Sequence, residues 1–224
     1  MSSRFIAEGA ILPRNCRLAW PFPGPRGWPR SHGECNRDVT PIIPFGKLTT
    51  HHGRMGTSNN NAEVAERFGL AATRFCSIVD SASHMDRGEF VAQIYRVLPK
   101  LIDQAIEMPD VEGSDRQQQK SSPKVRYAEW EQLYNSLKEK LGDWDLYHQV
   151  FDPTHDNEAI VGTLADDIAD IFDDLKEGLV FIEAAQANPE EAIWTWRLLF
   201  YSHWGKHAMD ALLAIHFQLQ NNAS

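Results

Sequence analysis

The chain has 224 residues, of which 42% are hydrophobic and 24% charged, an ordinary composition for a chain that forms one core. No stretch approaches the roughly 18 apolar residues of a membrane-spanning helix, so no membrane partner is expected. The formal net charge of −9 argues against a nucleic-acid partner, because a phosphate backbone favours Lys and Arg. The three cysteines, Cys16, Cys35 and Cys76, form no CxxC pair, which favours a reducing compartment and a cytoplasmic location.

The charge is distributed unevenly on the two sides of Met55. Residues 1–54 hold eight basic and three acidic residues and seven of the twelve prolines, which leaves 14 basic and 28 acidic residues in 55–224. The frequent Pro and Gly of the first part interrupt both helices and strands. We predict that residues 1–54 are disordered, or alternatively are not translated because the protein starts at Met55. Residues 55–224 are expected to form one acidic domain.

Apolar residues recur at helical spacing through most of that domain. The spacing predicts a first helix over 62–82, in which Cys76 is a small buried side chain rather than a reactive thiol. A second helix over 86–108 opens with Asp86 as its capping residue. Pro99 lies inside this second helix and predicts a kink or a break there.

A polar segment over 109–123 predicts a surface loop, and a third helix follows over 124–141. Gly142 stands where a glycine commonly ends a helix. Residues 143–156 are too aromatic for a free loop and predict a short turn of helix followed by an ordered loop. Aromatic side chains are frequent anchors of protein interfaces, so this segment is the predicted interaction surface, through Trp144, Tyr147 and Phe151.

The last two helices have clear start signals. Thr163 is the expected cap of the fourth helix, and Asn188 followed by Pro189 opens a fifth helix that extends over 188–219. The fifth helix is apolar nearly all round, which is typical of a helix that other helices surround. No segment indicates a strand. The sequence therefore predicts an all-α, five-helix, bundle-like domain with the hydrophobic C-terminal helix at its centre, preceded by an unstructured segment.

Carboxylates repeat along the predicted fourth helix at two spacings. One stripe lies opposite the apolar face and predicts a solvated surface, made of Asp166, Asp170, Asp173 and Glu177. Asp167 and Asp174 flank the edge of the core instead. These two are candidates for buried salt bridges or for metal ligands.

The fifth helix carries a second candidate site. His203, His207 and Asp210 follow one another at spacings of four and three, which places them on one stripe where they can share a metal ion. The alternative is that these histidines form hydrogen bonds with carboxylates of the fourth helix. A metal would need another ligand, for which the aromatic segment offers His148, Asp152 and His155.

Two segments carry a resemblance to a known family. They are Ile160-Val-Gly-Thr-Leu-Ala-Asp-Asp-Ile-Ala-Asp-Ile-Phe-Asp-Asp-Leu-Lys-Glu-Gly-Leu179, and Trp194-Thr-Trp-Arg with Ser202-His-Trp-Gly-Lys-His-Ala-Met-Asp-Ala-Leu212. The chain resembles the bacterial family catalogued as domain of unknown function 5063 from about residue 64 to 217. The resemblance implies a compact helical domain of bacterial origin, and it implies no activity and no site residues.

Two classes of function remain open. The chain lacks the GxSxG, GxxxxGK[ST] and GxGxxG patterns, and this favours a non-enzymatic module that binds a protein partner or has a regulatory role. No cofactor is predicted for such a module. The alternative is a metal-dependent hydrolase with a divalent metal between the fourth and fifth helices, at a His/His/Asp or Asp-rich site.

Overall fold

The computed structural model describes residues 57–111, 127–184 and 187–221. The predicted leader over 1–54 and most of the predicted loop over 109–123 lie outside these ranges. The side chains of Cys16 and Cys35 lie outside them as well.

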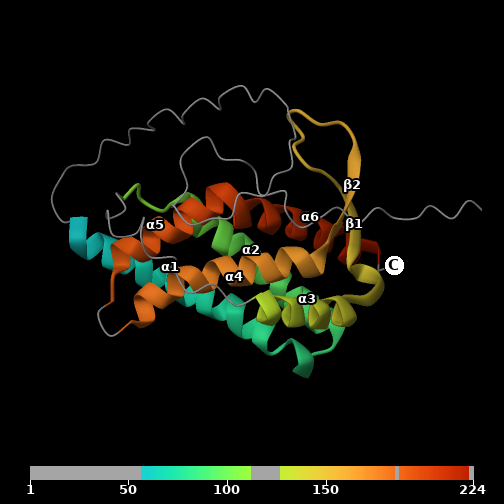
Figure 1. The fold of residues 1–224 in the computed structure, drawn as a ribbon, viewed down its shortest axis with the longest axis horizontal. Helices are drawn as coiled ribbons and strands as arrows, with labels where there is room; N and C mark the ends of the chain where they lie inside the picture. Colours follow the sequence, from blue (N-terminus) through green and yellow to red (C-terminus); the bar gives the residue numbers. More distant parts are fainter. Residues whose placement is uncertain (1–56, 112–126, 185–186, 222–224) are drawn as a thin grey trace, which may run out of the picture. The chain divides into compact units, whose positions relative to one another are not determined.

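Helices make up most of the described chain, as the sequence predicts (Figure 1). Two short 3₁₀ turns cover Ala82–His84 and Gly142–Trp144. The predicted fifth helix is continuous but contains one π-helical turn, Phe200–Trp204, between its two α-helical parts. The helices are α1 (Thr57–Asp80), α2 (Arg87–Ile106), α3 (Tyr127–Leu141), α4 (Leu164–Glu183), α5 (Pro189–Leu199) and α6 (Gly205–Asn221).

The expectation of no strand is wrong for one segment. Strand β1 (Leu146–Val150) pairs antiparallel with β2 (Ala159–Thr163), with Leu146 opposite Thr163 and Val150 opposite Ala159. Asp152 and Pro153, which exclude a helix, belong to the turn that joins the strands. Each strand has only five residues, so the period-2 pattern is too short to stand out in the sequence.

The predicted helix starts are confirmed by hydrogen bonds at the caps. Asp86 accepts from the backbone N–H of Glu89 at 2.8 Å, Thr163 Oγ1 from that of Asp166 at 3.3 Å, and Asn188 from that of Glu191 at 3.2 Å. The α4 cap has a second part that the sequence does not reveal. Asp145 accepts from the backbone N–H of Ala165 at 2.8 Å, which joins the end of α3 to the start of α4.

Of the two predicted alternatives at Pro99, a kink or a break, the break does not occur, because α2 continues through it to Ile106. Proline costs about 3 kcal/mol in a helix interior, since it removes a hydrogen bond and crowds the preceding turn. Buried neighbours on both sides offset this cost: Leu98 and Leu101 are fully buried. Gly142 has a φ of 58°, the left-handed conformation expected just after a helix.

Helix α4 contacts α1, α3, α5 and α6, and Figure 1 shows it between α3 and α6. The C-terminal helix contributes the largest fully buried side chains, Trp196 and Trp204. The Trp196 indole N–H donates to the carbonyl of Leu175 at 3.0 Å, where Gly178 leaves room for the ring. These contacts fix α5 against α4.

Cys76 is buried in α1 with 3% of its surface exposed, and burial raises the pKa of its thiol to about 12. This agrees with the predicted role as a small core side chain. Within the described ranges, no helix is long and apolar enough to span a bilayer.

Candidate metal centre

The candidate site lies where α4 faces the junction of the π turn and α6. Helix α4 contributes Asp167, Asp170 and Asp174, which at spacings of three and four share one face. His203 lies in the π turn, and His207 lies one turn later at the start of α6. A π turn inserts an extra residue into a helix and often occurs at functional sites.

Three ligand atoms converge at this junction. Nε2 of His203 lies 3.6 Å from Asp170 Oδ2, and Nε2 of His207 lies 3.5 Å from the same oxygen. The three ligand atoms all lie within 4.8 Å of one another. Ligands about 2.1 Å from a tetrahedral metal are separated by about 3.4 Å, so the two nitrogen–oxygen distances match those of a metal site.

The other ring nitrogen of each histidine is held by its own carboxylate. Nδ1 of His203 lies 2.6 Å from Asp174 Oδ2, and Nδ1 of His207 lies 2.8 Å from Asp167 Oδ1. An ionised carboxylate only accepts hydrogen bonds, so each Nδ1–H is the donor. Both Nε2 atoms therefore face Asp170. A neutral imidazole held in this way presents its Nε2 lone pair to a metal, as in sites where a carboxylate orients a metal-binding histidine.

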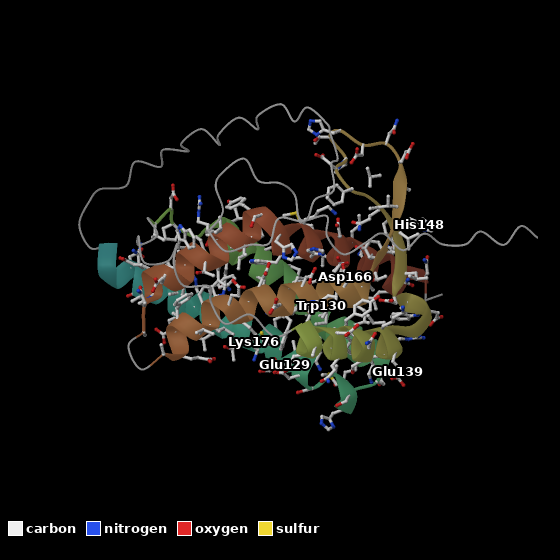
Figure 2. All side chains as sticks on the ribbon, in the orientation of Figure 1. Glu129, Trp130, Glu139, His148, Asp166 and Lys176 are labelled. Atoms are coloured by element: carbon white, nitrogen blue, oxygen red, sulfur yellow. The ribbon has the colours of Figure 1, made fainter. Side chains whose placement is uncertain are left out.

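A further layer of contacts fixes the carboxylates. The Tyr147 hydroxyl of β1 donates to Asp167 Oδ2 at 2.7 Å, and the Trp130 indole of α3 donates to Asp170 Oδ1 at 2.9 Å. Figure 2 shows Trp130 where α3 meets α4. The Trp130 bond occupies one oxygen of Asp170 and leaves Oδ2 for a ligand. Helices α3, α4 and α6, the π turn and strand β1 thus position one site.

Burial and charge act against each other in the cluster. Asp167 and Asp174 are almost fully buried, whereas 20% of the Asp170 side chain, 21% of His207 and 31% of His203 stay exposed. Burial opposes a charged His207, but the hydrogen bond and the negative charge of Asp167, together with Asp170, raise its pKa to about 9. Burial also raises the pKa of Asp167 and Asp170 against the effect of the histidines.

The structure brings together some of the sequence-predicted ligands and separates another. His203 and His207 share a site, and Asp167 and Asp174 bind them through Nδ1 rather than through Nε2. The predicted third ligand, Asp210, instead pairs with Lys206 on the same helix. Its place is taken by Asp170, which the sequence had assigned to a solvated stripe.

That solvated-stripe prediction is wrong. Glu177 has 7% of its surface exposed, and the Asp170 side chain lies between α3 and α6. The helical period correctly places this stripe away from the α4 apolar face. The helical period cannot show that side chains of other helices, Trp130, His203 and His207, cover the polar face of α4. The missed signal is that Asp167, Asp170 and Asp174 are spaced to face an i,i+4 histidine pair.

The three aromatic residues of the predicted interaction surface do not form one exposed face. Trp144 is buried beneath Arg87, whose guanidinium carbon lies 4.7 Å from its ring centroid. Tyr147 is directed to Asp167, and Phe151 is exposed but packs against Lys206. Tyr147 and Gln149 share one face of β1, and this face lies against α4 and α6 through the bonds of Tyr147 to Asp167 and of Gln149 to Lys206.

None of the suggested extra ligands from the aromatic segment joins the cluster. His155 and Asp152 pair with each other at 2.9 Å in the turn between the strands, and hydrogen bonds from Thr154 lower the pKa of Asp152 to about 2. His148 is exposed on β1 (Figure 2). Among the described residues, the only group with metal-ligand spacing is Asp170, His203 and His207.

Comparisons with known proteins place the chain in a family. The chain belongs to the family described as a domain of unknown function (DUF5063), whose model matches residues 59–221. The crystal structure of protein BF1032 from Bacteroides fragilis is similar in fold, with a TM-score of 0.54 and 23% identity over 66% of this chain and 87% of that one. No curated protein matches the chain.

Proposed function

We propose that this member of the domain-of-unknown-function family binds one divalent metal ion through Asp170, His203 and His207, and uses it for hydrolysis. The observation that carries the proposal is the pair of imidazole Nε2 atoms facing one carboxylate oxygen, with both Nδ1 atoms bound to buried carboxylates. Two histidines and one carboxylate are the ligand set of many catalytic zinc sites.

The ligand atoms of the site favour some metal ions over others. Imidazole nitrogen and carboxylate oxygen suit zinc and other first-row divalent ions better than calcium or magnesium, which prefer oxygen ligands alone. The hydrogen bonds from Nδ1 to Asp167 and Asp174 hold the two imidazoles in orientation, which strengthens binding to such ions. A zinc-type ion is therefore the expected occupant.

The number of ligands favours catalysis over a purely structural role. Structural zinc sites use four protein ligands, whereas catalytic sites use three and leave a position for water. The partial exposure of His203, His207 and Asp170 gives solvent access to that position. A metal held by Asp170, His203 and His207 would lower the pKa of a bound water toward about 7 and would so supply a nucleophile for hydrolysis at neutral pH.

The first test is metal binding by the full-length protein. After the protein is stripped with a chelator and desalted, titration with Zn²⁺ should give one site per chain. His203→Ala, His207→Ala and Asp170→Asn should each weaken binding at least 100-fold, because each removes one of three ligands. Metal-loaded and metal-free protein are then compared on ester, amide and phosphoester substrates.

Two variants provide matched controls. Asp210→Asn removes a carboxylate of the same helix that pairs with Lys206, and His216→Ala removes a histidine that contacts Tyr95 at 2.9 Å outside the cluster. Both should bind Zn²⁺ like the wild type. If Asp210→Asn and Asp170→Asn lost the same amount of Zn²⁺ affinity, or if the wild type bound no stoichiometric Zn²⁺, the proposed site would be excluded. Stoichiometric metal without metal-dependent turnover would exclude its use in hydrolysis.

A second function, binding of a protein partner, is supported by a different surface from the predicted one. Met209, Leu213 and Phe217 recur every four residues on α6 and are about half exposed, at 48%, 59% and 54%. Such an apolar stripe is typical of helix-mediated association. A partner that co-purifies from the native host should rebind as a purified protein to wild type and not to Leu213→Glu. Equal binding by the two would exclude this stripe.

A further inference from the structure

The described residues 57–111, 127–184 and 187–221 contain ten lysines and arginines, and seven of them contact a neighbour. Five pair with a carboxylate, Lys140 donates to the carbonyl of Met85, and Lys138 lies over the ring of Tyr134. The five ion pairs are Arg67–Glu107, Arg87–Asp143, Lys176–Asp80, Arg197–Asp110 and Lys206–Asp210.

The remaining three cations in this part of the chain, Arg74, Arg96 and Lys100, all line one groove. Its volume is about 380 Å³, within the range of small-molecule sites. Arg74 belongs to α1, while Arg96 and Lys100 lie one turn apart on α2. All three side chains are exposed, so their charged groups can reach a ligand.

The groove has an apolar floor beneath these cations. Ile78 and Val97 are 7% and 3% exposed and belong to the core between α1 and α2. Glu89 also lines the groove, near the start of α2, and accepts a hydrogen bond from Gln93 at 3.3 Å. Glu89 is the only carboxylate among the groove residues, and it is seven residues from Arg96.

This grouping of positive charge is unfavourable in the absence of an anion. Like charges at i,i+4 on a helix, as in Arg96 and Lys100, destabilise it. Residues 55–224 carry twice as many acidic as basic residues, so carboxylates are plentiful as partners. Every other described cation has a neighbour, and these three share a concave surface instead. That distribution is expected of a site that receives its negative charge from a ligand.

We propose that the groove between α1 and α2 binds a small phosphate-bearing anion. Arginine guanidinium groups donate pairs of hydrogen bonds to phosphoryl oxygens, and a lysine adds a point charge. Arg74, Arg96 and Lys100 hold the phosphoryl group, and the apolar remainder of the ligand contacts Ile78 and Val97. This site uses none of the residues of the metal centre.

Calorimetric titration with inorganic pyrophosphate tests the proposal on full-length protein that has been stripped of metal and desalted. Saturable binding at one site per chain is expected, and it should weaken with added salt. The variant R74Q/R96Q/K100Q should bind at least tenfold more weakly. The control variant R67Q/K138Q/K176Q loses the same charge at other positions of the described surface and should retain wild-type affinity within threefold.

The outcomes separate a site from a general effect of charge. A loss of pyrophosphate affinity confined to R74Q/R96Q/K100Q supports binding in the groove. Equal losses in both variants, or no saturable binding by the wild type, overturn it. Because the titration is done without metal, its failure leaves the proposed metal centre untouched, and failure of Zn²⁺ binding leaves the groove untouched.

Discussion

The tautomer of each site histidine is set by one buried aspartate. Asp174 and Asp167 accept from Nδ1 of His203 and His207, and they leave both Nε2 atoms for a metal. Asp167 also accepts from the Tyr147 hydroxyl, so its two oxygens have different partners. Residues that orient a ligand in this way commonly change metal affinity 10–100-fold when they are replaced.

We therefore predict that Asp167→Asn and Asp174→Asn each reduce Zn²⁺ affinity by about 10–100-fold without abolishing it. An Asn side chain keeps the shape and can accept the Nδ1–H bond, but it removes the negative charge that strengthens this hydrogen bond. Competition with a chromophoric chelator measures the affinity. Wild-type affinity in both variants would show that these aspartates do not act on the metal.

At the scale of single residues, the sequence predicts part of the site. His203 and His207 are accessible to prediction because i,i+4 spacing on one helix is a local property. Asp170 is not, because a helical wheel assigns polar residues to solvent and contains no information on the residues of α3 and α6 that cover it. Asp210 has ligand spacing, but its neighbour Lys206 provides a closer partner.

At the scale of elements, the packing of α5 on α4 depends on a close approach at one glycine. A Cβ on Gly178 would lie less than 3.0 Å from the indole of Trp196, which real Cβ atoms essentially never show. Trp196 is fully buried and also donates to Leu175, so its ring cannot move away without loss of that bond. This contact precedes the π turn that carries His203.

Gly178→Ala is expected to destabilise the protein by about 1–3 kcal/mol, the usual cost of overpacking a core. Gly69 provides a matched control, since a Cβ there would lie 3.6 Å from the same Trp196, an ordinary contact. Gly69→Ala should be neutral or stabilise α1 by up to about 1 kcal/mol, because Ala favours helix over Gly. Urea unfolding measures both, and equal stability of the two variants would contradict the packing at Gly178.

The element boundaries show where local rules suffice. The caps at Asp86, Thr163 and Asn188 follow from side-chain chemistry within three residues, and all three form. The hairpin of β1 and β2 depends on pairing between separate segments, from Val150 with Ala159 to Leu146 with Thr163, which is not a local property. Continuation through Pro99 likewise depends on burial against other helices.

At the scale of the whole molecule, the proposed metal centre joins α4 to the C-terminal helix, with α3 and β1 holding its carboxylates. The predicted all-α class is confirmed, and Trp196 and Trp204 of the C-terminal helix are fully buried. The last helix is apolar nearly all round, but it is not buried on every side. Met209, Leu213 and Phe217 form one stripe on it and are each about half exposed.

Because a metal would bind these elements only in the folded state, it should stabilise the whole domain. Zn²⁺ at 100 times its dissociation constant should add about 2.7 kcal/mol to the free energy of unfolding and raise Tm. The variant H203A/H207A should show no Zn²⁺-dependent rise, and differential scanning calorimetry with and without metal measures this. A rise of the same size in the variant would assign the stabilisation to another site.

The position of the metal is the most direct test of the account. Crystals of the full-length protein grown with Zn²⁺ and measured on both sides of the zinc absorption edge give an anomalous difference map. We predict one strong peak within about 2.0–2.2 Å of Asp170 Oδ2 and of Nε2 of His203 and His207. A fully occupied peak elsewhere, with none between α4 and α6, would contradict the central claim.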